Sequence, residues 1–97
     1  MLTAGTIRLD VEAHLVTCGE TRVQLTPREF ELLRLLLVNK GRLLSTRQIL
    51  DAIWGPDAGN HILRTFVHQL RAKLGECGSL IANDAGVGYA IRESDSA

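Results

Sequence analysis

The hydrophobic pattern of this chain changes its period at Thr26. Before that residue, apolar and polar side chains alternate, as at Ile7 and Leu9 and again at Val23 and Leu25, which is the period of half-buried β-strands. After it, leucines recur at helical spacing through "PREFELLRLLLV". The chain therefore combines an N-terminal antiparallel sheet with a mainly helical remainder, which is an α+β architecture.

Two helix starts carry the same capping signal. Thr26 is followed three positions later by Glu29, and Ser45 is followed three positions later by Gln48. In such a capping box the hydroxyl accepts a hydrogen bond from the third helical amide, and the Glu or Gln side chain accepts one from the amide of the cap. The sequence thus predicts one helix that begins after Thr26 and a second that runs from Ser45 to about Trp54.

A third helix is predicted over "NHILRTFVHQLRAKL", which carries an apolar stripe on one side and polar residues on the other. The stripe consists of Leu63, Phe66, Val67, Leu70 and Leu74. After this helix, "LIANDAGVGYAIR" has two short apolar segments around a glycine-rich bend, which is typical of a β-hairpin. The order of strands, three helices and a hairpin is the outline of a winged helix-turn-helix.

The composition limits the chain to one small domain. Its 97 residues, 45% of them hydrophobic, are enough for a single core. The expected domain covers residues 7–92, preceded by a disordered linker start at 1–6 and followed by a flexible tail at 93–97. The formal net charge is zero, so any contact with a polyanion must be local.

The cysteine and hydropathy patterns predict a cytoplasmic protein without a cofactor. Cys18 and Cys77 are far apart in the sequence and have no metal-ligand spacing, so free thiols are expected, although the sequence leaves a disulfide between them open. The apolar run "LLRLLLV" is far shorter than the ~20 residues that a membrane span needs, and no signal peptide is evident. No metal site is expected, because His61 and His68 have no third ligand nearby.

Several motifs in a fixed order resemble one known family. The segments "LTPREF", "GRLLS", "LDAIWG", "LRAKL" and "GVGY" are similar to those of the DNA-binding output domain of OmpR/PhoB-type two-component response regulators. The resemblance covers roughly residues 7–92, and within the family it favours the branch that regulates potassium uptake. It implies a four-stranded N-terminal sheet, three helices and a hairpin wing. It further implies a receiver domain outside this chain, a sensor kinase that acts on it, RNA polymerase as a partner, and two copies bound to direct-repeat DNA half-sites.

The resemblance also implies where double-stranded DNA would bind. The third helix would enter the major groove through His61, Arg64, Thr65, His68 and Gln69. Backbone phosphates would meet Thr46 and Arg47 at the start of the second helix. The wing would reach the minor groove through Asn83, Ala85, Gly86, Val87 and Gly88. The loop expected to contact polymerase consists of Gly55, Pro56, Asp57, Ala58, Gly59 and Asn60.

The residue types on the third helix suit base recognition. Arg64 can bridge two acceptors on guanine or bind a phosphate, Gln69 can pair with adenine, and Thr65 can bond a phosphate or pack its methyl group against thymine. The wing departs from the family, since many relatives have arginine where Ala85 and Ala90 stand. Those two phosphate contacts therefore do not carry over to this chain.

Other interpretations of the same pattern remain open at this point. A polar helix face is most often merely solvated, and Arg71 and Lys73 lie near the core boundary, where they would cover the core or pair with an acid. The same fold could serve an activator that needs no kinase, or a winged helix that binds only protein. An enzyme is disfavoured, because no acid–base pair or activated nucleophile has a recognisable spacing.

Overall fold

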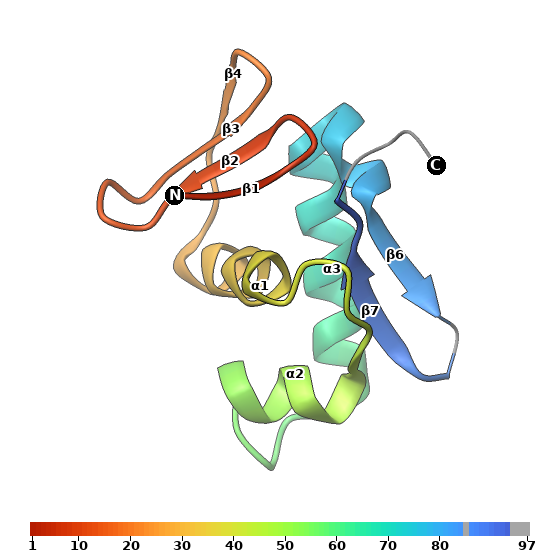
Figure 1. Cartoon of the computed structure of the whole chain (residues 1–97). Coiled ribbons are helices and arrows are strands. Elements are labelled where there is room, and N and C mark those ends of the chain that lie inside the picture. The colour runs from red at the N-terminus through yellow and green to blue at the C-terminus, as the bar shows by residue number, and fades with distance from the viewer. Residues whose placement is uncertain (85, 94–97) are drawn as a thin grey trace.

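The N-terminal third of the chain is a four-stranded antiparallel sheet. A computed structural model describes residues 1–84 and 86–93 (Figure 1). The strands follow one another in the sheet in the order β1-β2-β3-β4. They are β1 Leu2–Ala4, β2 Ile7–Asp10, β3 Leu15–Cys18 and β4 Thr21–Val23. Ile7, Leu9, Val16 and Val23 turn into the core, as the alternation predicts.

The expected disordered start is wrong for residues 2–4. They form β1, in which Leu2 pairs with Leu9 and Ala4 with Ile7, and Ala4 is only 2% exposed. Three residues are too few for a periodicity to show in the sequence, and β1 is specified by backbone pairing with β2 instead. The amide of Gly5 also donates to the carbonyl of Glu93 at 2.6 Å, which ties the two ends of the domain together. The rest of the expected flexible tail, 94–97, lies outside the described residues.

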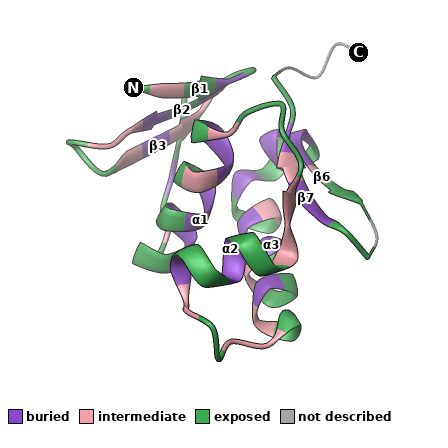
Figure 2. Cartoon of the chain, turned by 60° about the horizontal axis from the view of Figure 1, so that its bottom comes forward, coloured by how far each residue is buried: buried purple, intermediate pink, exposed green. Residues whose placement is uncertain are grey.

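Three α-helices follow, at the predicted places. They are α1 Pro27–Val38, α2 Thr46–Ile53 and α3 Asn60–Leu74. Both capping boxes are present, with Thr26 and Ser45 as the N-caps. α1 lies between the N-terminal sheet and α2, and both helices contact α3 (Figure 1). The stripe predicted on α3 is confirmed, since Leu63, Val67, Leu70 and Leu74 are buried (Figure 2).

The C-terminal hairpin belongs to a second, three-stranded sheet. A 3₁₀ helix, η1 Gly75–Leu80, leads from α3 into β6 Ile81–Asp84, which pairs with β7 Gly88–Ile91. The hairpin was predicted, but neither η1 nor the third strand, β5 Leu44–Ser45, was expected. A two-residue strand has no sequence period, and β5 exists only because β7 pairs with it. The winged helix-turn-helix architecture is confirmed.

Gly88 allows β5 and β7 to approach each other closely. In the pairing, Ser45 lies opposite Gly88, and a Cβ atom at position 88 would lie 1.8 Å from the carbonyl oxygen of Leu44. No side chain fits at that distance, so this position requires glycine. From the sequence, the glycines of the wing were predicted only to allow the bend of the hairpin. That explanation suits Gly86, whose φ is 79°, whereas Gly88 is needed for close backbone packing.

One charged side chain lies inside the core. Glu29 is 1% exposed, and its Oε1 accepts hydrogen bonds from the Thr26 amide at 2.8 Å and from Lys73 Nζ at 2.6 Å. Burial raises the pKa of Glu29. The bonds from Lys73 and Thr26 and the charge of Lys73 outweigh burial, so the net pKa lies below its ordinary value of 4.5. This pair joins the start of α1 to the last turn of α3, as expected for a Lys73 that pairs with an acid.

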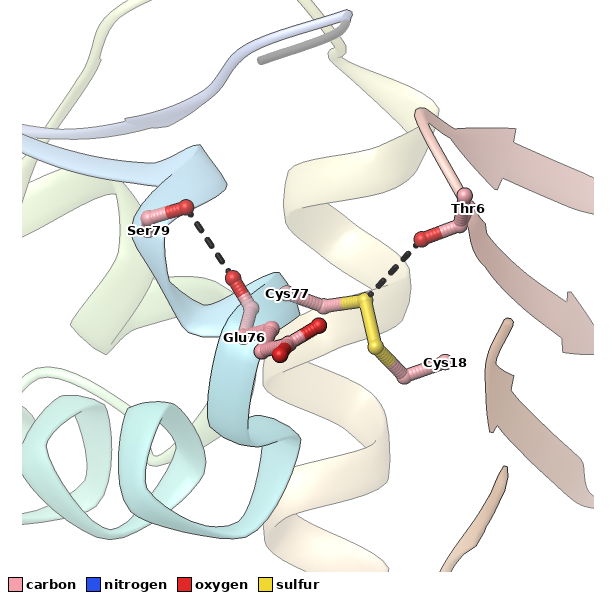
Figure 3. Close-up of a disulfide and its surroundings, with 5 residues drawn as sticks. All are labelled: Thr6, Cys18, Glu76, Cys77 and Ser79. Atoms are coloured by element: carbon pink, nitrogen blue, oxygen red, sulfur yellow. Dashed lines mark hydrogen bonds between the residues drawn. A yellow bond between two sulfur atoms is a disulfide. The ribbon is translucent and has the colours of Figure 1, made fainter. Parts of the chain in front are cut away.

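The two cysteines form a disulfide, so the expectation of free thiols is wrong. Cys18 ends β3 and Cys77 lies in η1, with their Cα atoms 6.0 Å apart although the two residues are 59 positions apart in the sequence (Figure 3). The sequence offered no way to place Cys77, because η1 was not predicted. Its turn brings Cys77 back against the end of β3, within the range of Cα separations that a disulfide spans.

We expect Lys73→Met to lower the free energy of unfolding by about 1–3 kcal/mol at neutral pH, because a buried carboxylate would lose its charged partner. This loss of stability is smaller than the loss expected for a fully buried ion pair, since the Lys73 side chain is 40% exposed. Urea unfolding measures the difference. Lys40→Met is the matched control, because Lys40 is an exposed lysine that donates only to the carbonyl of Thr3. Equal losses for the two variants would contradict this account of the pair.

The same carboxylate predicts a component of acid denaturation. Because the folded pKa of Glu29 is lowered, the stabilisation is complete above the ordinary value of 4.5 and is lost as the pH falls through the folded pKa. Glu29→Gln cannot ionise, so its stability should vary less with pH below about 5. Glu31→Gln serves as the control, since Glu31 is 53% exposed in a surface pair and should leave the acid limb unchanged. If the stability of Glu29→Gln falls as steeply below pH 5 as that of the parent, other groups cause the acid denaturation.

Candidate nucleic-acid interface

The predicted recognition residues share one exposed face of α3. The helix buries its apolar stripe against α1, α2 and η1, which leaves the polar side free. That side presents the exposed residues His61, Arg64, Thr65, His68 and Gln69. Within the described chain, no hydrogen bond or ion pair uses the side chains of Arg64, His68 or Gln69. Their donors and acceptors are therefore available to a ligand.

Two residues of this face are already oriented by local contacts. The hydroxyl of Thr65 donates to the carbonyl oxygen of His61 at 3.0 Å, so its proton is occupied within the helix. Thr65 can then offer its methyl group and oxygen lone pairs, which favours a thymine methyl over a phosphate. The His61 ring folds back over the N-cap of α3, since a Cβ atom at Gly59 would lie 3.0 Å from its Nδ1. A side chain at position 59 would therefore require the His61 ring to shift.

A groove runs beside this face, between α3, the start of α2 and the wing. Its volume is about 670 Å³. Arg64 and Asn60 line it from α3, Thr46 lines it from α2, and Asn83 and Asp84 line it from β6. The sequence predicted Asn60 as the start of the third helix and as part of the loop expected to contact polymerase, but not as a residue of this groove. In the structure, Asn60 is the first residue of α3.

The wing residues differ in what they can offer. Asn83, Gly86 and Val87 are exposed, while Gly88 is largely buried against the backbone of Leu44. Val87, with 48% of its surface exposed, is the apolar group at this end of the hairpin. Ala85 lies outside the described residues. Asp84 places a carboxylate in the groove opposite Arg64 on α3, so the groove carries both signs of charge.

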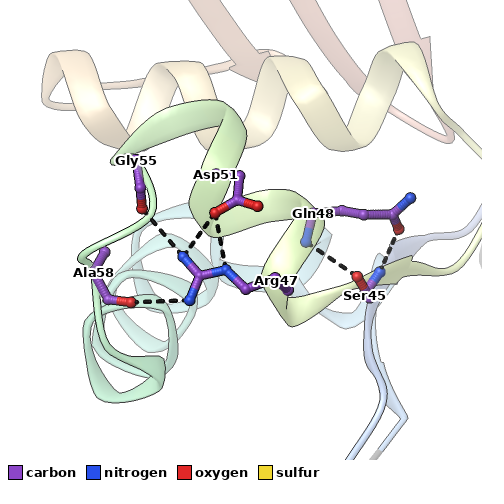
Figure 4. Close-up of polar contacts among 6 residues, drawn as sticks. All are labelled: Ser45, Arg47, Gln48, Asp51, Gly55 and Ala58. Atoms are coloured by element: carbon purple, nitrogen blue, oxygen red, sulfur yellow. Dashed lines mark hydrogen bonds and ion pairs between the residues drawn. The ribbon is translucent and has the colours of Figure 1, made fainter.

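Arg47 is engaged within the protein rather than directed at a free phosphate. Its guanidinium pairs with Asp51 at 2.8 Å and donates to the carbonyl oxygens of Gly55 at 3.1 Å and Ala58 at 3.3 Å (Figure 4). These contacts hold the loop between α2 and α3 against the start of α2. The sequence could not indicate this use, because the loop carbonyls reach Arg47 only once the two helices are packed.

The N-terminus of α2 is also largely occupied. The Gln48 amide donates to Ser45 Oγ at 3.0 Å, and Gln48 Oε1 accepts from the Ser45 amide at 2.8 Å (Figure 4). The amide of Thr46 donates to the carbonyl of Val87 at 3.1 Å. The amides of Thr46 and Gln48, which could otherwise donate to a DNA phosphate, are therefore used by the wing and by the capping box. The hydrogen bond from the Thr46 amide to the Val87 carbonyl fixes the wing against the start of α2.

The loop between α2 and α3 is anchored at its base and exposed at its tip. The Trp54 ring contacts Phe66 of α3 edge-on, with ring centroids 5.0 Å apart, and the Gly55 amide donates to the Leu50 carbonyl at 2.8 Å. Pro56 and Asp57 are exposed. The tip thus presents an acidic, proline-containing surface on a rigid base.

The described residues hold no group of three or more histidine, cysteine, aspartate or glutamate side chains arranged to bind a metal ion. None of the described helices has the length and hydropathy needed to cross a membrane. Nothing in this groove brings an acid and a base together on a candidate substrate, and its chemistry is that of polar and charged recognition.

Comparison with known proteins decides the family. Residues 19–91 match the family model described as "Transcriptional regulatory protein, C terminal". The chain belongs to this family. It is an OmpR/PhoB-type DNA-binding domain of a response regulator, a transcription-factor module and not an enzyme.

Individual relatives agree with this assignment. The response regulator protein PmrA of Pseudomonas aeruginosa is 42% identical over 92 residues, which are 93% of this chain and 41% of that protein. The KDP operon transcriptional regulatory protein KdpE of Escherichia coli is 39% identical over 88 residues, 86% of this chain and 39% of that protein. The chain thus spans about two fifths of the length of these relatives. The DNA-binding domain of Bacillus subtilis CssR superposes with a TM-score of 0.77 at 30% identity, covering 88% of this chain and 98% of that one.

The position of Arg47 leads to a prediction about salt. Arg47→Ala should weaken DNA binding by disturbing the loop and the start of α3, but the slope of log K against log salt should stay unchanged, because no phosphate contact is lost. A salt titration of the parent and the variant on one duplex measures both quantities. A slope smaller by about one phosphate contact would instead mean that Arg47 turns to the DNA backbone.

Proposed function

We propose that this domain binds a specific operator in double-stranded DNA by placing α3 in the major groove. The observation that carries the proposal is the unpaired Arg64 on the exposed face of α3, beside a groove that the wing closes on the other side. A chain with no net charge cannot bind by bulk attraction, so the contacts must come from such placed side chains. The chemical groups of these side chains determine which bases they recognise.

Each recognition residue has a role in this proposal. Arg64 binds a guanine edge or a phosphate, Gln69 pairs with adenine, and Thr65 packs its methyl group against thymine. His61 and His68 lie two turns apart on the same face of α3, and their ring nitrogens contact the DNA backbone or base edges. Asn60 of α3 and Asn83 of β6, which both line the groove, add polar contacts.

The wing contributes less to affinity than the helix does. Asp84 gains no attraction from a phosphate, and Arg47, the cation at the start of α2, is held by the loop. A single domain therefore binds weakly, and two copies on direct-repeat half-sites raise the effective concentration of each for its site. Thr46, with its amide bonded to the wing, positions the hairpin rather than the DNA.

The partners of the whole protein follow from its relatives. We propose that a receiver domain, phosphorylated by a sensor kinase, regulates this domain, since the relatives PmrA and KdpE are response regulators more than twice its length. The exposed loop tip at Pro56 and Asp57 is the surface proposed for RNA polymerase. Its support is the rigid base formed by Trp54 and Phe66.

We further propose potassium-uptake genes as the regulated targets. The support is the 39% identity to KdpE and the segment "IWGPDA". Relatives with other names are equally similar, among them PmrA at 42%, so the target must be read from DNA. Genome-wide footprinting of the full-length protein should place its strongest sites upstream of potassium transporter genes. Sites confined to unrelated promoters would refute this target and leave operator binding intact.

We expect Arg64→Ala to weaken binding to the operator by about 1–3 kcal/mol and to leave the fold unchanged, because the Arg64 side chain is exposed and makes no hydrogen bond or ion pair within the described chain. Titration of one operator and one scrambled duplex in the same salt measures affinity and specificity. Arg34→Ala is the matched control, since it removes the same charge from the exposed face of α1, away from the groove. Equal affinity for Arg64→Ala and the parent would exclude Arg64 from the interface.

A further inference from the structure

The disulfide joins two parts of the domain that differ in role. Cys18 lies at the end of β3 in the N-terminal sheet, and Cys77 lies in η1, the segment between α3 and the wing (Figure 3). Removing it would leave η1 attached to the sheet only by weaker contacts. The disulfide therefore links the N-terminal sheet to η1, the segment that connects the two candidate DNA-binding elements, α3 and the wing.

The two cysteine residues differ in exposure. Cys77 is 2% exposed, whereas Cys18 is partly exposed at the edge of the Gly19 turn. An incoming thiolate must approach one sulfur from solvent, on the side away from the other sulfur. Cys18 is the sulfur that such a reagent reaches, which leaves Cys77 as the sulfur that departs.

The buried sulfur has a hydrogen-bond donor in place. Thr6 Oγ1 lies 3.3 Å from Cys77 Sγ (Figure 3). A sulfur in a disulfide carries no hydrogen, so the hydroxyl donates and the sulfur accepts. The Thr6 carbonyl in turn accepts from the Gly19 amide at 2.9 Å, which holds Thr6 beside the disulfide. A hydroxyl fixed there stabilises negative charge that develops on Cys77 Sγ as the bond breaks.

We propose that Cys18–Cys77 is a reversible redox site for dithiol reductants, in which Cys18 is attacked and Cys77 departs as a thiolate that the Thr6 hydroxyl stabilises. One reductant thiolate bonds to Cys18 Sγ, the Sγ–Sγ bond breaks, and its electron pair goes to Cys77 Sγ. The second reductant thiol then displaces Cys18. The reductant is oxidised to its disulfide, and its two protons end on Cys18 and Cys77.

Reduction loosens the domain rather than unfolding it. Other contacts still hold η1 and the segment after it, among them the bonds from Arg71 to the Ile81 carbonyl at 2.7 Å and from the Arg92 amide to the Leu80 carbonyl at 2.8 Å. The cross-link nevertheless closes a long loop that includes all three helices, so its loss costs substantial stability. The redox state of the pair thereby sets how firmly α3 and the wing are held to the sheet.

The site of attack can be trapped directly. The 97-residue chain is treated with the monothiol glutathione, quenched with acid and mapped by peptide mass. The expected product carries glutathione on Cys18, with a free thiol on Cys77. Glutathione predominantly on Cys77, or a disulfide that remains intact in millimolar thiol under native conditions, would overturn the proposal.

The role of Thr6 is tested by the rate of reduction with dithiothreitol. Thr6→Val keeps the shape without the hydroxyl and should be reduced roughly tenfold more slowly, whereas Thr6→Ser keeps the hydroxyl and should match the parent. A merely structural role of Thr6 would not slow the reaction, because a loosened disulfide is reduced faster. Equal or faster reduction of Thr6→Val would refute the assistance of this hydroxyl.

The consequence for the fold is measured by thermal unfolding. Dithiothreitol should lower the melting temperature of the parent by about 10 °C or more. The double variant Cys18→Ser/Cys77→Ser should melt near the reduced parent and should not respond to dithiothreitol. A melting temperature of the parent that is the same with and without reductant would show that the pair does not control the stability of the domain.

Discussion

The ion pair between the buried Glu29 and Lys73 joins the first helix of this domain to the last turn of α3. A carboxylate that is 1% exposed is tolerated only because it also completes the cap of α1 through Thr26. It thereby fixes where α1 starts and how the last turn of α3 lies against it. Since α1 separates the sheet from α2, the position of the exposed face of α3 depends on this contact.

A second set of contacts determines what the interface offers. Arg47 holds the loop after α2, and the Thr46 amide holds the wing at Val87. The polar groups at the start of α2 therefore assemble the groove instead of binding in it. Arg64 remains as the unpaired cation of the groove within the described chain. Within the described chain, the groove therefore has its unpaired cation on α3 and a carboxylate, Asp84, on the wing side.

Much of the fold was predictable from local signals. The two capping boxes predicted where α1 and α2 begin, because a capping box is formed by residues close together in the sequence. They consist of Thr26 with Glu29 and of Ser45 with Gln48. The stripe that includes Leu70 gave the buried side of α3 and hence its exposed side. The choice of recognition residues followed from periodicity and from the family resemblance, and the structure places all five on the exposed face.

The sequence by itself determined the three helices, the hairpin and the exposed side of α3, since each depends on spacing within one segment. Only the tertiary structure decided the rest: the strand β5, the engagement of Arg47, the pairing of Cys18 with Cys77, and the need for glycine at position 88. Each of these joins segments distant in sequence, and its partner is set by how the helices and sheets pack. No local pattern encodes such a contact, because the energy that favours it exists only after folding.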